Sequence, residues 1–503
     1  MKLLIANRGE IAIRIARTAR RMGIPTVAVY SEADRDAEFL RHADEAFGIG
    51  PAEPKASYLN VDRILEVAKI SRATLVHPGY GFLSERPHFV RACEAAGIGF
   101  VGPTAENMEV MGDKIRARET CDRLGVPRVP GSKGAVASAS EARAVAEQIG
   151  FPVLLKAAAG GGGKGMRRVD RPEDVSAAFD GATREALGAF GDGALYVEKY
   201  ILNPHHIEVQ VFGDGKGGAL HLGERECSIQ RRHQKVWEEA PSPLMERFSE
   251  KREALFVSAL RIVQSLKYRG AGTLEFVADE EGRCYFLEMN TRLQVEHPVT
   301  EWVTGVDLVG WQIELATGKW KSPPLSDGGV PRRGAAIEAR LYAEDPHSFL
   351  PAPGKLAQIT LPTGPFVRSD SAYSEPGTVP VYYDPMISKV SVWGGTREEA
   401  CGRMRVALSE TRAEAPRSPR GDRLGGLRTN LDFLRRIAAH PQVLSGDTST
   451  SLISDHPELT AERVWSEGSS AMVIAAAIFE SSHSAASTGG VWIRTASQEG
   501  LRP

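Results

Sequence analysis

Residues 1–30 read MKLLIANRGEIAIRIARTARRMGIPTVAVY, which alternates strand-like and helix-like patterns. The runs Lys2–Ala6 and Thr26–Tyr30 are apolar and strand-like, and Ile11–Met22 between them carries apolar residues at helical spacing. The strand-like run Thr74–His77 again follows a helical stretch. Alternating strands and helices predict a parallel sheet with helices on both faces. We therefore expect an N-terminal α/β domain.

The turn after the first strand does not have the pattern of a dinucleotide site. It reads Asn7-Arg8-Gly9-Glu10, with a single glycine. The G-x-G-x-x-G fingerprint needs its further glycines so that a pyrophosphate can approach the backbone closely. NAD or FAD binding at this turn is therefore disfavoured.

Length and composition are those of a globular protein with several domains. The chain has 503 residues, of which 42% are hydrophobic and 25% are charged, which excludes a mostly disordered or collagen-like chain. Its 62 Lys+Arg against 64 Asp+Glu give a formal net charge of -2, so nothing in the overall charge favours nucleic acid or an anionic membrane. Five scattered cysteines without a C-x-x-C motif indicate a reducing compartment. We found no signal peptide and no apolar run of membrane-spanning length, so the expected location is the cytoplasm, with no membrane partner.

Beyond the first domain the pattern changes to strand-rich, α+β segments. Strand-like runs cluster between residues 205 and 300. The Asp/Pro/Gly-rich stretch Ser322–Arg333 resembles a linker, and Ala335–Tyr342 and Ile387–Trp393 predict strands of a further α+β unit. Ala413–Gly426 is rich in Pro, Arg and Gly and predicts an exposed loop.

A glycine cluster directly after a buried-looking strand is the sharpest local signal. It reads Lys156-Ala-Ala-Ala-Gly-Gly-Gly-Gly-Lys-Gly-Met166. Consecutive N–H groups of such a loop can converge on phosphate oxygens, and the lysines add positive charge. The alternative is a flexible linker, although linkers usually contain serine and lie between domains. The spacing excludes a Walker loop, and phosphate binding is the favoured interpretation.

A second signal is a predicted hairpin that carries oxygen ligands. Two apolar strands flank the turn-like residues Asp279–Arg283. Alternation places Glu288 and Asn290 on one face of the second strand, and Glu275 of the first strand can face the same way. Carboxylate and amide oxygens suit Mg²⁺ that bridges ATP phosphates. Surface acids on an amphipathic hairpin are the alternative, but a polar row at alternate positions continues through Arg292, Gln294 and Glu296.

A third stretch, residues 221–241, is rich in basic and amide side chains without helical periodicity. A solvated charge run is its ordinary explanation. Next to a phosphate loop, it equally predicts a basic segment that faces the terminal phosphate. His205 and His206 have no partner near enough in sequence to argue for zinc.

Together these segments resemble the ATP-grasp superfamily, and within it biotin carboxylase. The resemblance covers residues 1–446, and several of its motifs are long and unusual. They are Ala6–Ala12, His77–Glu85, Gly112–Lys114, Lys156–Met166, Glu224–Pro241, Glu288–Glu301, Ala343–Pro346, Tyr383–Met386 and Thr429-Asn430.

The resemblance implies three domains. These are an N-terminal α/β domain at residues 1–112, an ATP-grasp domain at 113–321 with a mobile lid at about 129–200, and a C-terminal α+β domain at 334–446. Residues 447–503 would be a weakly patterned tail that could begin a region leading to a carrier domain.

The resemblance also implies roles for residues that match the family's motifs. ATP would be bound by Lys114, Lys156, Gly162, Gly163, Glu198, Lys199, Tyr200, Ile201, His206, Gln230, His233, Glu275 and Glu288. Bicarbonate would be held by Lys235, Arg292, Gln294 and Val295, and Mg²⁺ or Mn²⁺ by Glu275, Glu288 and Asn290. Lys235, Arg292, Glu296 and Arg340 would be catalytic, with Glu296 as the base for bicarbonate and Arg340 stabilising the biotin enolate.

The implied activity is ATP- and bicarbonate-dependent carboxylation of biotin through carboxyphosphate, the first half-reaction of an acyl-CoA carboxylase. An acetyl-CoA carboxylase of fatty acid biosynthesis is the first expectation, with propionyl-CoA, methylcrotonyl-CoA and pyruvate carboxylase systems as alternatives. The implied partners are a biotin carboxyl carrier protein or domain, a carboxyltransferase subunit and a second copy of the chain.

Two departures from the family pattern and two competing functions remain. The region Thr411–Gly426 looks about a dozen residues longer than the family's usual connection, which predicts a loop insertion, and no Ala-Met-Lys-Met biotinylation sequence occurs. The chain would then act on a separate carrier, or be a truncated version of a longer α subunit.

Two other functions compete with this interpretation. The first is an ATP-grasp ligase for another carboxylate, which Gln294–Pro298 together with Arg340 disfavours. The second is an inactive regulatory subunit, which is disfavoured because every charged residue assigned above is present.

Overall fold

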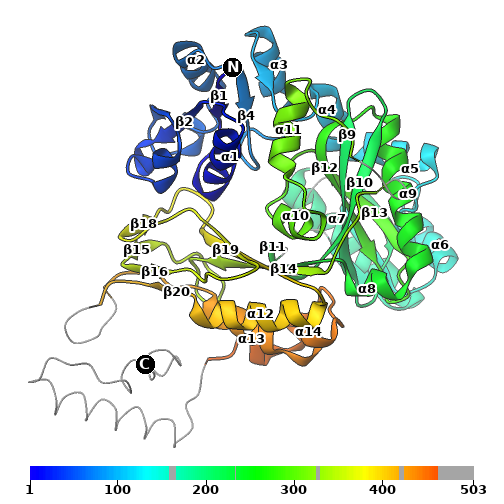
Figure 1. Ribbon diagram of the computed structural model, residues 1–503. Coiled ribbons are helices and arrows are strands. Elements are labelled where there is room, and N and C mark those ends of the chain that lie inside the picture. Colours follow the sequence, from blue (N-terminus) through cyan, green and yellow to red (C-terminus); the bar gives the residue numbers. More distant parts are fainter. Residues whose placement is uncertain (158–165, 233, 324–328, 418–423, 463–503) are drawn as a thin grey trace, which may run out of the picture.

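The computed structural model describes residues 1–157, 166–232, 234–323, 329–417 and 424–462 (Figure 1). The N-terminal unit is a five-stranded parallel sheet in the order β3-β2-β1-β4-β5. Its strands are β1 (Leu3–Ile5), β2 (Thr26–Ser31), β3 (Glu45–Gly50), β4 (Leu75–His77) and β5 (Gly99–Phe100), and its helices are α1 (Gly9–Arg21), α2 (Val61–Ser71), α3 (Pro87–Ala95) and α4 (Ala105–Gly112).

Both faces of this sheet are buried, as the sequence pattern predicts. Leu3 and Ile5 pack in one apolar cluster with Ile15 of α1, whereas Leu4 packs in another with Ile64 of α2. Because successive strand side chains point to opposite faces, an unbroken apolar run is what a sheet covered on both sides requires. The expected α/β class of this unit is confirmed.

An eight-stranded sheet runs through the rest of the molecule in the order β13-β12-β9-β10-β11-β14-β19-β17. Its strands are β9 (His205–Asp214), β10 (Ala219–Arg231), β11 (Gln234–Ala240), β12 (Arg269–Ala278), β13 (Cys284–Asn290), β14 (Ala335–Tyr342), β17 (Val367–Ser371) and β19 (Met386–Gly394). All of its pairings are antiparallel. The pairing of β11 with β14 joins the middle and C-terminal parts of the chain into one sheet, which the sequence pattern did not indicate.

Helices cover this sheet on both faces (Figure 1). In the middle part they are α5 (Lys114–Leu124), α8 (Pro243–Arg247), α9 (Ser249–Ser265), α10 (His297–Thr304) and α11 (Leu308–Ala316). In the C-terminal part they are α12 (Arg397–Glu410), α13 (Leu431–Ala439), α14 (Pro441–Ser445) and α15 (Leu452–Asp455). Helix α12 packs on one side of β14 and β19, and α10 packs on the other.

A small separate unit contains the lysine that precedes the glycine cluster. Its antiparallel sheet has the order β7-β6-β8, with β6 (Val153–Ala157), β7 (Met166–Val169) and β8 (Leu195–Lys199). Helices α6 (Ala139–Ile149) and α7 (Val175–Phe190) complete it around an apolar core of its own. A unit with its own core can move as a body relative to the large sheet.

The remaining strands form two short pairs in the C-terminal part. They are β15 (Gly354–Leu356) with β18 (Gly377–Val379), and β16 (Gln358–Thr360) with β20 (Arg412–Glu414). The loop predicted at Ala413–Gly426 therefore begins as a strand, and residues 418–423 lie outside the described part of the chain. Leu452 and Leu459 are buried in the C-terminal core, so the described part of the tail packs against this unit.

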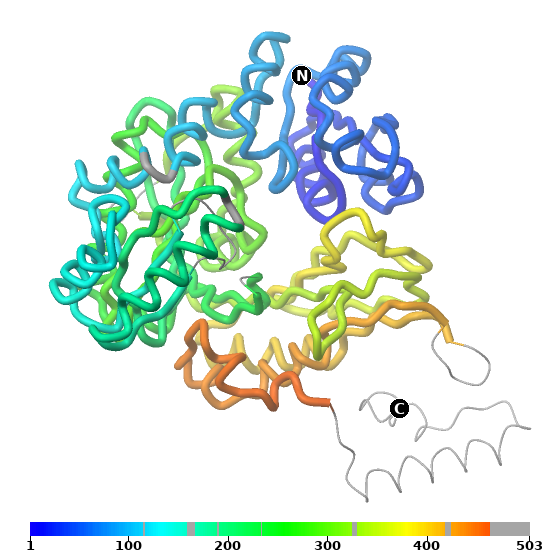
Figure 2. Tube along the Cα trace, turned by 180° about the vertical axis from the view of Figure 1, so that it is seen from behind, coloured from blue at the N-terminus to red at the C-terminus, as the bar shows by residue number. Residues whose placement is uncertain are grey.

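Figure 2 shows the three parts of the molecule grouped around a common centre. Within the described ranges, none of the helices combines the length and the apolar character that crossing a bilayer requires.

Candidate active site

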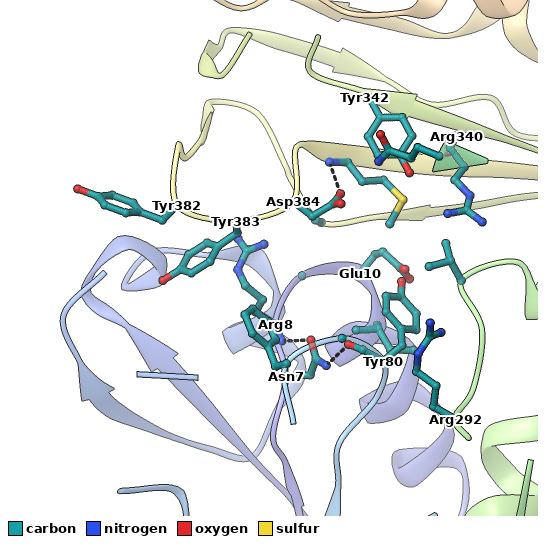
Figure 3. A pocket seen from close by; sticks show the side chains of 18 residues that line it. Asn7, Arg8, Glu10, Tyr80, Arg292, Arg340, Tyr342, Tyr382, Tyr383 and Asp384 are labelled. Atoms are coloured by element: carbon teal, nitrogen blue, oxygen red, sulfur yellow. Dashed lines mark hydrogen bonds between the residues drawn. The ribbon is translucent and has the colours of Figure 1, made fainter. Parts of the chain in front are cut away.

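A cavity of about 530 Å³ lies where the N-terminal unit meets the large sheet (Figure 3). Two N-terminal loops, the loop before α10, strand β14 and the turn before β19 contribute to its wall. The lining residues are Asn7, Arg8, Gly9, Glu10, Ile11, Tyr80, Gly81, Phe82, Gln234, Arg292, Val295, Arg340, Tyr342, Ala372, Tyr382, Tyr383, Asp384 and Met386.

Asn7 holds the two N-terminal loops of this wall together. Its amide nitrogen donates to the carbonyl oxygens of Pro78 at 2.6 Å and Tyr80 at 2.7 Å. Gly79 lies against this contact with φ +63°, and a Cβ there would come within 2.8 Å of the Asn7 nitrogen. The glycine is therefore required both for the backbone conformation and for the close approach.

The ammonium group of Lys235 is the centre of a buried charge cluster beside the cavity. Its Nζ lies 3.0 Å from Glu275 and 2.9 Å from Glu296, and it also contacts Glu208. Burial lowers the pKa of Lys235, but the three carboxylates raise that pKa well above its ordinary value. Lys235 is therefore a permanent cation in a water-poor environment.

Glu296 is held between two cations. Its Oε1 lies 2.9 Å from Lys235 Nζ, and its Oε2 lies 2.8 Å from Arg340 Nη2. Burial raises the pKa of Glu296, but Lys235 and Arg340 lower that pKa below its ordinary value. The carboxylate is thus ionised at neutral pH and able to accept a proton.

Arg292, Gln294 and Val295 lie in a loop that connects β13 to α10. Their alternating polarity does not come from a strand: residues 291–296 form a loop, and α10 begins at His297, followed by Pro298. Proline at the start of a helix has no N–H to lose and is pre-set for helical φ.

Hydrogen bonds fix this loop. Arg292 donates to Glu85 at 2.8 Å, to the side-chain oxygen of Gln294 at 3.0 Å and to that of Asn290 at 2.9 Å. The ammonium group of Lys389 donates to the carbonyl oxygen of Val295. Among the described residues, Gln294 Nε2 and Arg340 Nε are buried and have no hydrogen-bond partner. Buried donors without acceptors suit an anionic or carbonyl-bearing ligand.

The predicted hairpin has the expected register. Glu275 of β12 is directly opposite Glu288 of β13, and Thr273 is opposite Asn290. Asn290 donates to Glu275 Oε1 at 2.8 Å. Two carboxylates and an amide on one face of a rigid hairpin are a donor set that fits Mg²⁺ or Mn²⁺.

His206 lies beside Glu275, one of the oxygen ligands of this hairpin. Its Nε2 lies 3.2 Å from Glu275 Oε2 and 3.4 Å from Glu208 Oε1. The sequence neighbours of His206 gave no argument for zinc, and the structure adds a possible metal-ligand group. Glu208 lies two residues along the same strand, and Glu275 comes from the neighbouring strand β12. Burial lowers the pKa of His206, but Glu275 and Glu208 raise it to about 9.

The predicted nucleotide residues on the small unit form a separate group. Lys156 of β6 and Arg118 of α5 both contact Glu198 of β8, at 2.5 and 2.8 Å. The Lys199 ammonium donates to the carbonyl oxygens of Gly150 and Phe151, so its side chain stabilises a neighbouring loop.

Three other predicted nucleotide residues are also described. The Tyr200 ring lies 4.6 Å from the Arg168 guanidinium, and Gln230 donates to the carbonyl oxygen of Cys227 at 2.8 Å. Ile201 is half-buried. Gly162, Gly163, His233 and the side chain of Lys114 lie outside the described residues.

Several residues of the site were missed by sequence reasoning. Glu208 binds both Lys235 and Arg225, the latter at 2.8 Å, and Glu85 binds Arg292. Glu85 and the cavity residues Tyr383 and Asp384 belong to motifs that carried the resemblance, so a signal for them was present. Glu208 alternates with apolar residues within β9, so its local pattern does not distinguish it from a surface acid.

Comparisons with known proteins give a consistent result. Family models match residues 1–108 (biotin carboxylase, N-terminal domain), 113–322 (carbamoyl-phosphate synthase L chain, ATP binding domain) and 338–455 (biotin carboxylase C-terminal domain). A biotin carboxylase of Halalkalibacterium halodurans is 47% identical over 92% of this chain and 99% of its own. The mouse mitochondrial methylcrotonoyl-CoA carboxylase subunit alpha is 46% identical over 90% of this chain and 62% of its own.

Solved structures agree. The Campylobacter jejuni biotin carboxylase in a β,γ-ATP complex has a TM-score of 0.80 and 45% identity, over 90% of this chain and 98% of its own. The biotin carboxylase domain dimer of Hydrogenobacter thermophilus 2-oxoglutarate carboxylase, in complex with MgADP, ADP and bicarbonate, has a TM-score of 0.80 and 44% identity, over 92% of this chain and 99% of its own.

Proposed function

This chain belongs to the biotin carboxylase family of ATP-dependent ligases, and from that premise we propose that it carboxylates biotin on a separate carrier protein through carboxyphosphate. The observation that carries the proposal is Glu296, an ionised buried carboxylate held between Lys235 and Arg340. A base that faces a cation-lined site is what bicarbonate activation needs.

In the first step, Glu296 takes the proton of bicarbonate while Lys235, Arg292, Gln294 and the Val295 backbone hold the anion. The freed oxygen forms a bond to the γ-phosphorus of ATP, and the bond from that phosphorus to the ADP oxygen breaks. The products are ADP and carboxyphosphate. Lys235 stays protonated throughout and offsets the charge that gathers on the phosphoryl oxygens.

In the second step, the carbon–oxygen bond of carboxyphosphate breaks to give CO₂ and phosphate. The phosphate takes the N1′ proton of biotin, and N1′ then attacks CO₂. Arg340 stabilises the enolate oxygen of biotin, to which its unpartnered buried Nε can donate. The small unit that carries Lys156 would close over the site and exclude water, which is needed because carboxyphosphate hydrolyses in open water.

ATP would be bound by Lys114, Lys156, Gly162, Gly163, Glu198, Lys199, Tyr200, Ile201, His206, Gln230, His233, Glu275 and Glu288. Glu275, Glu288 and Asn290 would hold Mg²⁺ or Mn²⁺, which when bound neutralises phosphate charge. Their common hairpin face supports this assignment.

For the domain limits we propose 1–112, 113–321 with the lid at 129–200, and a third domain from 334. The family matches and the separate core of the lid support these limits. Burial of Leu452 and Leu459 supports extending the third domain from residue 446 to 462.

The proposed final acceptor is acetyl-CoA, through a carboxyltransferase partner and in the cytoplasm. Propionyl-CoA, methylcrotonyl-CoA and pyruvate are the alternatives, since relatives at 45% identity include a propionyl-CoA carboxylase alpha chain and a methylcrotonoyl-CoA carboxylase subunit alpha. Capture of the biotinylated partner on avidin, followed by its identification, tests which acceptor is used.

We also propose that the chain forms a homodimer, as in the Hydrogenobacter domain dimer.

The decisive assay is bicarbonate-dependent ATP hydrolysis with and without free biotin. Stimulation by biotin together with carboxybiotin formation is the expected result. ATP cleavage that needs an amine instead of biotin would identify another ATP-grasp ligase. ATP binding without any turnover would identify a regulatory subunit.

We expect Lys156→Ala to weaken ATP binding about tenfold or more while the melting temperature changes little. Lys156 is about one-third exposed and paired with Glu198, and such pairs contribute only about 0–1 kcal/mol to stability. Loss of a charge at a phosphate costs more. Nucleotide affinity and thermal unfolding should be measured together, with Arg143→Ala, which breaks the exposed Arg143–Glu147 pair, as the control. Unchanged affinity in a folded variant contradicts the assignment.

A further inference from the structure

One face of the large sheet carries an unusual row of buried charges next to the proposed biotin site. In the β11–β14 pairing, Glu238 is directly opposite Glu338. In the β14–β19 pairing, Arg340 is opposite Lys389. Since strand side chains alternate, Glu338 and Arg340 share a face, and the ion pair of Arg340 with Glu238 puts Glu238 on the same face. The opposite face of β14 is apolar and packs on α12, and on β11 that face also carries the ion pair of Glu239 with Arg397.

Glu238 and Glu338 are both completely buried. Among the described residues, Glu238 Oε2 and both carboxylate oxygens of Glu338 have no hydrogen-bond partner, and Glu238 Oε1 has only its ion pair with Arg340. Two carboxylates that face each other away from water cannot both be ionised without a large cost. Unsatisfied buried polar atoms of this kind need an explanation, and a shared proton supplies one.

The pair is connected to the reaction through a single nitrogen atom. Arg340 Nη2 lies 2.5 Å from Glu238 Oε1 and 2.8 Å from Glu296 Oε2. The guanidinium is therefore held by one carboxylate from β11 and by the proposed bicarbonate base. When Glu296 takes a proton, Glu238 is the anion that continues to hold Arg340 in place.

Charged groups face the pair from every element packed against it. Lys235 lies on β11 itself and lowers the pKa of Glu238. Glu296 lies in the loop before α10 and raises that pKa. Lys389 of β19 lowers the pKa of Glu338 and also contacts Glu10 of α1. On β17, Asp370 and Arg368 pair with each other, and His297 of α10 is a neutral buried ring.

We propose that Glu238 and Glu338 together hold one proton, and that the single remaining negative charge of this pair positions Arg340 for the biotin half of the reaction. Glu238 and Glu338 are then positioning residues, since they act through Arg340 and do not contact substrate. This inference rests on the proposed function.

The direction of the titration agrees with the geometry. Burial raises the pKa of Glu238 to about 7 against the lowering effect of Arg340. Burial raises the pKa of Glu338 well above its ordinary value, and Glu238 adds to this, while Lys389 opposes it. Glu338 is thus the member that keeps the proton at neutral pH.

The first test separates carboxylation from ATP cleavage. Glu238→Gln should lower biotin carboxylation about 100-fold, because misplacement of a catalytic group by about 1 Å costs that much, and should retain most bicarbonate-dependent ATP cleavage. Glu238→Asp, which restores the charge, should recover part of the loss. Carboxylation by Glu238→Gln at the wild-type rate overturns the proposal, and so does an equal loss of both activities in a folded variant.

Glu239→Gln is the matched control. Glu239 follows Glu238 on β11, is also buried, and pairs with Arg397 at 2.6 Å away from the cavity. This variant should lose stability without changing the ratio of carboxylation to ATP cleavage. If this ratio changed as much as in Glu238→Gln, loss of any buried ion pair in β11 would be enough to impair carboxylation selectively. That result would overturn the positioning role of Glu238.

The second test concerns stability and needs no activity. A carboxyl whose pKa is higher in the folded than in the unfolded protein stabilises the fold at low pH, and this contribution is lost as pH rises toward the folded pKa. Glu338→Gln cannot ionise, so its melting temperature relative to the wild type should rise by about 2 °C or more between pH 5 and pH 9. A flat difference across this range overturns the shared proton, even if Glu238→Gln fails to fold.

Failure of the inference can be told apart from failure of the proposed function. If the function is wrong, the wild-type chain itself lacks biotin-stimulated, bicarbonate-dependent ATP cleavage. If only the inference is wrong, the wild-type chain is active, and the Glu238 variants carboxylate biotin at the wild-type rate.

Discussion

Glu296→Gln is expected to lose both bicarbonate-dependent ATP cleavage and biotin carboxylation, by about 100- to 10,000-fold. The amide keeps the size of the side chain but cannot accept the bicarbonate proton, so carboxyphosphate does not form. ADP release and carboxybiotin formation should be measured separately, together with a melting curve, because Glu296 also lies between Lys235 and Arg340. Removal of one partner of a buried ion pair can itself cost about 3–5 kcal/mol.

Arg340→Ala provides the contrast within this prediction. It should lower carboxylation about 100- to 1,000-fold, the usual cost of removing an oxyanion donor, while appreciable ATP cleavage continues. Parallel losses of both activities that follow the melting temperature in both variants would contradict this division of roles. Glu301→Gln is a useful stability control, since Glu301 is a residue of α10 that pairs with Arg14 and Arg368 and has no proposed role in the reaction.

Glu288→Gln is expected to lower turnover at ordinary Mg²⁺ about 100-fold or more, since a metal ion contributes several kcal/mol of charge stabilisation. Glu288 is exposed on β13, opposite Glu275, so the substitution should leave the fold intact. Activity should be titrated against Mg²⁺ and Mn²⁺, and excess metal should restore part of the rate. The matched control is Glu281→Gln in the turn of the same hairpin. Near wild-type turnover by Glu288→Gln would show that Glu288 is not a ligand.

Features that depend on short stretches of sequence were predictable. The parallel N-terminal sheet follows from the alternation of apolar runs in the first hundred residues, and both faces of that sheet are indeed buried. The register of Glu275 with Glu288 follows from two strands joined by a short turn, because a hairpin turn limits how its strands can pair. The polar row at Arg292, Gln294 and Glu296 indicated a site but not its backbone, because residues 291–296 form a loop and alternating polarity alone does not distinguish a loop from a strand.

Sequence alone determined the family, the class of each unit and the chemical types at the proposed site, since these depend on spacing within a motif. Tertiary structure decided how the motifs combine. It joined β11 to β14, surrounded Lys235 with three carboxylates, and placed Glu238 opposite Glu338. These contacts link residues up to about a hundred positions apart, and their register is set by packing of the whole sheet against α10 and α12. Burial then sets the charge state of each group, because the cost of removing a charge from water depends on everything that surrounds it.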